Sequence, residues 1–78
     1  MTWNYRIIKK TLPGGEGYYG IHEVFYEDKK PVMVTEDGIA PYGESEQELL
    51  GHYELMGEAF RAPVLDYEKD FPDDQVDK

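Results

Sequence analysis

Apolar and polar residues alternate along the first half of the chain, the pattern of strands that bury one face. Trp3, Tyr5 and Ile7 fall on one face of the first such stretch. A turn segment with one proline and three glycines, residues 12–17, follows it, and short charged segments punctuate the later stretches. The pattern predicts a three-stranded antiparallel meander. Its strands are expected at residues 3–10, 18–26 and 31–35.

The period of the apolar residues changes to three and four after residue 45, which predicts a helix. Ser45 and Glu48 form a capping box, in which each side chain can bond to the backbone amide of the other residue. Pro63 ends the pattern. The predicted apolar face consists of Leu49, Tyr53, Met56 and Phe60.

The predicted fold class is α+β, a three-stranded antiparallel meander with one helix packed on one face. Residues 64–67 are expected to add a short fourth strand or an extended segment. Gly57, on the apolar face of the helix, would allow close approach to the sheet. We expect residues 1–69 to form a single domain and residues 70–78 an acidic, disordered tail. The core candidates are Trp3, Tyr5, Ile7, Ile21, Val34, Leu49, Tyr53, Met56 and Phe60.

Charge is unevenly distributed along the chain. Residues 1–35 carry five basic and four acidic side chains, whereas residues 36–78 carry three basic and thirteen acidic ones, which together give the net charge of −9. Such a field repels phosphate groups, so we expect neither a nucleic acid nor a membrane as a partner. It suits a basic protein, although an acidic surface can also serve solubility alone.

The sequence excludes several kinds of chemistry. Without cysteine there are no disulfides, thiolate metal sites or cysteine nucleophiles, and the one serine, Ser45, is occupied by capping. Asp66, Glu68 and Asp70 have the spacing that opens a calcium loop, but Phe71 stands where that loop needs glycine. We therefore expect no metal and no cofactor. No apolar run reaches signal-peptide or membrane length, which favours a cytoplasmic location.

The candidate binding residues lie on the second strand and on the helix. One helix covers only one face of a three-stranded sheet, so Tyr18, His22 and Tyr26 would face a partner unless residues 64–67 or a nearby loop cover them. Both faces of the second strand are apolar, so the sequence leaves open which of them is buried. The acidic residues of the helix would face a basic partner. These are Glu46, Glu54 and Glu58.

The runs YYGIHEVFY (18–26), TED (35–37), PYGES (41–45) and PVLDY (63–67) resemble a family of small bacterial proteins of unassigned function. This resemblance spans about residues 4–68. The run GESEQEL (43–49) more weakly resembles the start of the helix in HicB-type antitoxin domains, although the Asp-Gly-Gly-Tyr strand motif of that family is not reproduced. The second resemblance implies a β-β-β-α arrangement and a partner-binding role.

The leading hypothesis is a non-enzymatic protein-binding or regulatory module, antitoxin-like, that engages a basic protein or a second copy of itself. One alternative is a small acid–base enzyme centred on His22, which requires a carboxylate beside that histidine in a pocket. Another is an acidic mimic of nucleic-acid charge, which requires the acidic side chains to line one surface.

Overall fold

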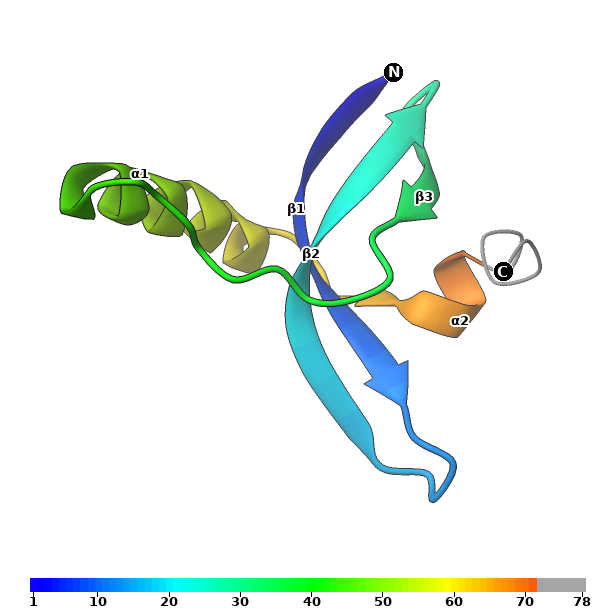
Figure 1. The fold of residues 1–78 in the computed structure, drawn as a ribbon. Coiled ribbons are helices and arrows are strands. Elements are labelled where there is room, and N and C mark those ends of the chain that lie inside the picture. Colours follow the sequence, from blue (N-terminus) through cyan, green and yellow to red (C-terminus); the bar gives the residue numbers. More distant parts are fainter. Residues whose placement is uncertain (72–78) are drawn as a thin grey trace.

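The computed structural model describes residues 1–71, which form a four-stranded mixed sheet with helical segments on both faces (Figure 1). The strand order is β3-β2-β1-β4, in which β1 pairs antiparallel with β2, β2 antiparallel with β3, and β1 parallel with β4. The elements are β1 Thr2–Thr11, β2 Gly17–Glu27, β3 Lys30–Val34, α1 Glu46–Met56, η1 Gly57–Arg61, β4 Leu65–Asp66 and α2 Tyr67–Asp70.

The α+β class is confirmed, and the predicted meander is confirmed in part. β1, β2 and β3 follow one another in antiparallel order, and the fourth strand at residues 65–66 joins β1 in parallel. The β2–β3 turn places Asp28 and Lys29 at φ values of 51° and 68°. Two successive residues with positive φ are typical of the tight hairpin turns whose twist matches that of the flanking strands.

The helix begins with the predicted capping residue. The Ser45 hydroxyl accepts a hydrogen bond from the amide of Glu48 at 3.2 Å. The reciprocal bond differs from the prediction, because the Glu48 carboxylate accepts from the amide of Glu44 at 3.0 Å and not from that of Ser45. Glu46 and Glu48 place negative charge in the first turn, where the helix dipole favours it.

The predicted packing of the helix across the sheet is wrong. Figure 1 shows α1 extending away from the sheet, and Met56, its last residue, is its one buried residue. Leu49 and Tyr53 are exposed because the helix axis leaves the sheet surface. Phe60 is exposed because η1 is a 3₁₀ segment with three residues per turn, so Ala59 faces β1 instead.

Two small clusters form the core, one on each face of the sheet. On the α1 side the buried residues are Tyr5, Ile7, Met56 and Ala59, with Ile21 and Ile39 packed against them. On the α2 side they are Ile8, Val24, Val34, Tyr67 and Phe71, with Tyr26 and Leu65 packed against them. Of the predicted core, Tyr5, Ile7, Val34 and Met56 are buried and Ile21 is half-buried, but Trp3, Leu49, Tyr53 and Phe60 are not.

The short helix α2 holds the end of the described chain against the sheet. Asp66 caps it, since one carboxylate oxygen accepts from the amides of Glu68 and Lys69, each at 3.0 Å. These hydrogen bonds, that from Lys69 first, lower the pKa of Asp66. Phe71, which the sequence placed in the tail together with Asp70, is buried in the core. The remaining tail, residues 72–78, lies outside the described residues.

Candidate protein-binding surface

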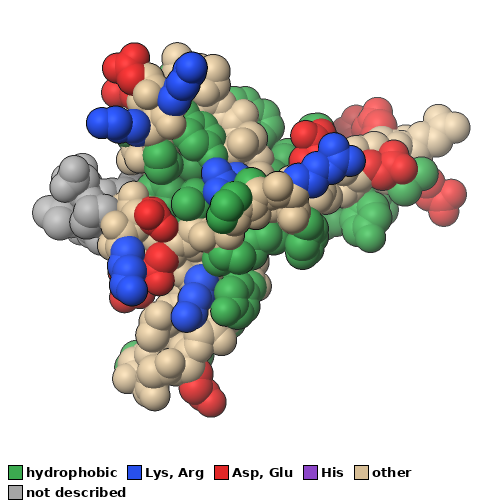
Figure 2. All heavy atoms as spheres, turned by 180° about the vertical axis from the view of Figure 1, so that it is seen from behind, with side chains coloured by type: hydrophobic (Ala, Val, Ile, Leu, Met, Phe, Trp, Pro, Cys, Tyr) green, Lys and Arg blue, Asp and Glu red, His purple; other side chains and the backbone are tan. Residues whose placement is uncertain are grey.

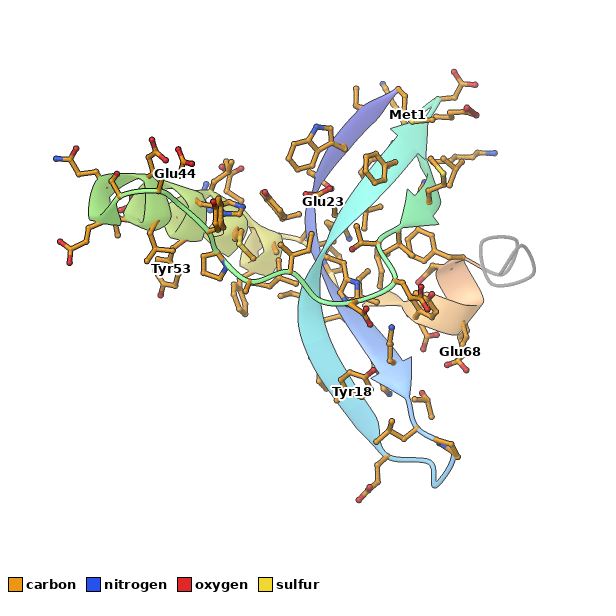
Figure 3. All side chains as sticks on the ribbon, viewed as in Figure 1. Met1, Tyr18, Glu23, Glu44, Tyr53 and Glu68 are labelled. Carbon is orange, nitrogen blue, oxygen red and sulfur yellow. The ribbon has the colours of Figure 1, made fainter. Side chains whose placement is uncertain are left out.

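The predicted binding face on β2 is covered. His22 has only 2% of its surface exposed, and Tyr26 is half-buried against the cluster that α2 completes. Tyr18 remains exposed, far along the β1–β2 hairpin from helix α1, which carries Tyr53 (Figure 3). The structure therefore does not bring the three aromatic candidates together on an open face, because the α2 cluster covers Tyr26 and the segment around Thr35 and Gly38 covers His22.

His22 sits in a tight structural site. Its Nδ1 lies 2.8 Å from the carbonyl oxygen of Thr35, to which it donates, while its Nε2 faces the backbones of Gly20 and Gly38. No carboxylate hydrogen-bonds to His22 within residues 1–71, and His22 lines none of the depressions described below. In this arrangement His22 is almost fully buried, and its side chain hydrogen-bonds to Thr35.

Burial lowers the pKa of His22, and the Lys10 charge adds to this effect, against the opposing effects of the Thr35 carbonyl and Asp37. As the pH falls below about 6.5, the unfolded chain takes up a proton that the folded chain does not. We therefore expect the free energy of unfolding to fall with pH in this range, by up to about 1.4 kcal/mol per pH unit.

Urea denaturation at a series of pH values between about 8 and 5.5 measures this slope. His22→Asn is the matched variant, since its amide can still donate to Thr35 but does not titrate. The variant should show a shallower slope over this range. Equal slopes for the two proteins would contradict the assignment to His22.

The arm, defined as α1 and η1 (residues 46–61), carries the three acidic candidates and an unusual amount of exposed apolar surface. Tyr53 is 63% and Phe60 is 74% exposed, and Leu49, Leu50 and Leu55 are exposed as well. Figure 2 shows hydrophobic side chains along the projecting arm and on the adjoining sheet, with acidic groups toward its free end. These hydrophobic side chains of the arm are therefore exposed to water and do not pack in the core.

Three open depressions on one side of the arm join into a continuous surface, here called the arm surface. They measure about 430, 330 and 380 Å³. The first shares Ile21 and Phe60 with the second, and Pro41 and Tyr53 with the third. Glu54 lines the first and Glu46 the third. The apolar residues of the arm surface are Ile7, Tyr19, Ile21, Ile39, Pro41, Leu49, Leu50, Tyr53, Met56, Phe60, Ala62 and Val64.

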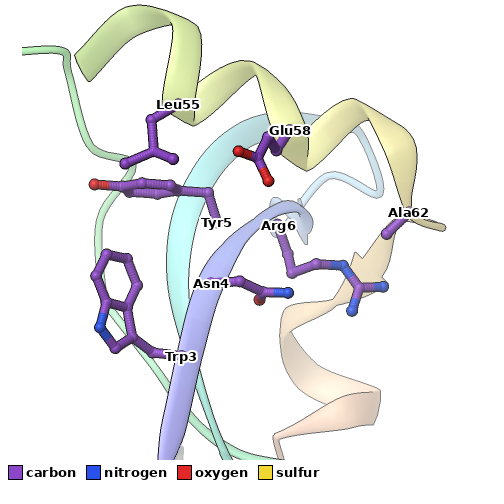
Figure 4. Close-up of a pocket in the computed structure, with 7 residues that line it drawn as sticks. All are labelled: Trp3, Asn4, Tyr5, Arg6, Leu55, Glu58 and Ala62. Atoms are coloured by element: carbon purple, nitrogen blue, oxygen red, sulfur yellow. The ribbon is translucent and has the colours of Figure 1, made fainter. Parts of the chain in front are cut away.

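A separate depression of about 400 Å³, here called the β1 groove, lies between β1 and the other side of the arm (Figure 4). Leu55 lies over the ring of Tyr5, and Glu58 faces the strand from above. Burial, and then the negative charge of Glu23, raise the pKa of Tyr5. The lining residues are Trp3, Asn4, Tyr5, Arg6, Leu55, Glu58 and Ala62.

His52 fixes the arm to the sheet. Its Nδ1 accepts from the backbone amide of Tyr42 at 2.8 Å, so Nδ1 is unprotonated and the proton of the neutral ring is on Nε2. Nε2 lies 2.8 Å from the hydroxyl of Tyr5 and donates to it. The histidine thereby links the segment before α1, the helix and β1, so the arm has a defined direction.

The sequence analysis did not identify Leu50 and Leu55 as exposed residues of the helix. Both lie away from the face formed by Leu49, Tyr53 and Met56, so apolar residues are spread over more of the helix than one core contact requires. That excess was the available signal for a helix that contacts more than its own sheet.

Residues 1–71 contain no group of three or more histidine, cysteine or acidic side chains placed to hold a metal ion. None of the described helices is long and apolar enough to cross a membrane. Comparisons with protein-family models, with curated proteins and with solved structures found no match.

Proposed function

We propose that this protein is a non-enzymatic protein-binding module that engages a basic partner through its arm. The observation that carries the proposal is the exposure of α1, in which Met56 is the one buried residue. An isolated helix shorter than about 12–15 residues is marginal in water, so an eleven-residue helix that projects from its domain gains stability from a bound partner.

The apolar area suits an interface. Tyr19 and Tyr53 are 62% and 63% exposed, and Phe60 is 74% exposed. Full burial of an aromatic side chain removes roughly 150–250 Å² from water, so these three alone offer roughly 300–500 Å². A standard interface buries about 800 Å² on each side, and the exposed leucines of the arm add to the aromatic area.

The charge around the arm supports a basic partner. Residues 31–60 contain seven acidic side chains and no lysine or arginine. A basic surface would meet these charges favourably and would associate faster at low salt than at high salt. A second copy of this chain would bring the same negative charge, so we place self-association behind a basic partner. An antitoxin-like regulatory role is compatible with this mode of binding.

Affinity capture from a lysate of the source cells, at low and high salt, tests the proposal with two double variants. Leu50→Ser with Tyr53→Ser removes two exposed side chains of the arm surface. We expect it to lose the basic partner, by roughly 30-fold or more in affinity if the tyrosine is a hot spot. Leu12→Ser with Tyr18→Ser removes the same residue types from the β1–β2 hairpin and should retain the partner.

Because all four side chains are exposed, both variants should fold, which circular dichroism checks. Equal capture by the two variants would contradict the role of the arm. Loss in the hairpin variant alone would favour the surface that the sequence first indicated, around Tyr18.

A further inference from the structure

Strand β1 has an outer edge that is mostly unpaired within residues 1–71. Its inner edge pairs with β2 along the whole strand, from Thr2 to Thr11. Its outer edge pairs with β4 only at Ile8 and Lys9. Within residues 1–71, no strand occupies the outer edge between Thr2 and Ile7. Such an edge is a ready template for another chain, and this part of β1 contains neither proline nor lysine to discourage pairing.

The direction of the free backbone groups follows from the bonds of β2. The carbonyls of Ile21 and Glu23 accept from the amides of Ile39 and Thr35, on the side of β2 away from β1. Successive residues of an antiparallel strand bond alternately to its two sides, so the intervening even-numbered residues of β2 bond to β1. Those residues are Gly20, His22 and Val24, and they stand opposite Ile8, Arg6 and Asn4.

The same alternation applies to β1. Since Asn4 and Arg6 bond to β2, the N–H and C=O groups of Trp3 and Tyr5 point to the outer edge. These two residues also line the β1 groove. These four backbone groups, which pair with no strand within residues 1–71, therefore lie beside a depression whose opposite wall is the arm (Figure 4).

We propose that the outer edge of β1 accepts an extended, basic segment of the partner as an added strand, seated in the β1 groove. This inference rests on the proposed protein-binding function and specifies the conformation of the bound segment. Main-chain hydrogen bonds to Trp3 and Tyr5 supply affinity, and alternate side chains of the segment contact the arm. The added strand would extend the sheet by one member at the position that β4 leaves open.

The lining of the groove selects the segment. Leu55 and the ring of Tyr5 form an apolar wall for one side chain, and the carboxylate of Glu58 is placed to bind a basic one. Glu23 adds negative charge near Tyr5. The guanidinium of Arg6 is already engaged by the hydroxyl of Tyr26 and the carbonyl of Pro63. A second copy would bring another net charge of −9, which disfavours self-pairing at this edge.

The test uses peptides selected from a random twelve-residue library on the full-length protein. We expect the selected peptides to be basic, to shift the fluorescence of Trp3 and to slow hydrogen exchange at the amides of Trp3 and Tyr5. Trp3→Pro removes the outward N–H of residue 3 and leaves the hydrogen bonds to β2 in place. Trp3→Thr is the control, because it lacks the indole as the proline variant does but retains the N–H. The proline variant should bind the same peptide at least tenfold more weakly than the threonine variant.

Equal affinity in the proline and threonine variants overturns strand addition, as does a library that yields no binder. Peptides that protect the arm surface and leave the amides of Trp3 and Tyr5 unchanged also overturn it, but leave the proposed function intact. A peptide that slows hydrogen exchange at the amides of Trp3 and Tyr5 supports strand addition. If the same peptide binds the Leu50→Ser, Tyr53→Ser variant with unchanged affinity, the arm surface has no part in the proposed function. Protection in peptide-free dimers, detected by sedimentation, overturns the assignment of the edge to a foreign segment.

Discussion

Replacing Phe71 by alanine is expected to lower the free energy of unfolding by about 3–5 kcal/mol. The ring is 2% exposed and belongs to the cluster of Ile8, Val24 and Tyr67, so its removal leaves a cavity in the larger of the two core clusters. Small domains have a total stability of about 5–15 kcal/mol, so the variant should be partly unfolded under mild conditions. Urea denaturation followed by Trp3 fluorescence and circular dichroism measures the change.

Phe60→Ala is the matched control, since it deletes the same side chain at a position that is 74% exposed. We expect it to change the free energy of unfolding by no more than about 0.5 kcal/mol. The two variants therefore separate two descriptions of the fold. A large loss for Phe60→Ala together with a small loss for Phe71→Ala would favour the sequence-based core, with the helix packed across the sheet, over the structure described here.

The local parts of the fold were predictable because their causes lie within a few residues of one another. Period-two alternation gave β1, and the positive φ values in the β2–β3 turn belong to a short charged segment between two strands. The capping residue Ser45 marks the helix start in the sequence and in the structure alike. Such signals depend on backbone geometry and local hydrogen bonds, which tertiary packing leaves unchanged here.

The direction of the helix was not predictable in the same way. A stripe of apolar residues such as Leu49, Tyr53 and Met56 says which side of a helix meets an apolar surface, but not which surface it meets. Of these three residues only Met56 is buried in the structure, and Leu49 and Tyr53 are exposed. The prediction that Phe60 lies in the core assumed a continuous α-helix. The chain changes to a 3₁₀ segment after Met56, which rotates the side chains that follow.

The candidate site was also predictable only in part. Glu46, Glu54 and Glu58 line depressions beside the arm, as expected of acidic residues on an exposed helix. Their role in binding stays a prediction. His22 is buried against Thr35 and Gly38, in the segment that follows β3. Tyr26 packs against the α2 cluster, which includes Phe71 from an acidic stretch where composition favoured a tail. One aromatic residue there, together with the cap at Asp66, outweighed the local composition.

A second pair of matched variants, both glycine to alanine, should change stability in opposite directions. A Cβ at Gly43 would lie 2.3 Å from the amide nitrogen of Leu49, so Gly43→Ala must displace the segment before α1 from the first helical turn. We expect a loss of about 1–3 kcal/mol in the free energy of unfolding, as for other overpacked sites. Displacement would also strain the bond from the Tyr42 amide to His52 and thereby loosen the arm.

Gly51 is the opposite case, because a Cβ there would meet nothing within 4 Å on an exposed helix. Gly51→Ala should therefore raise the free energy of unfolding by roughly 0.5–1 kcal/mol, through helix propensity alone. Gly57 is equally open, so the close approach to the sheet expected there is not the reason for that glycine. Urea denaturation of the Gly43→Ala and Gly51→Ala variants measures both changes in the free energy of unfolding, and circular dichroism measures their helix content. A neutral Gly43→Ala would mean that the segment before α1 does not pack on the helix, and the arm would then lack the fixed direction on which its binding surface depends.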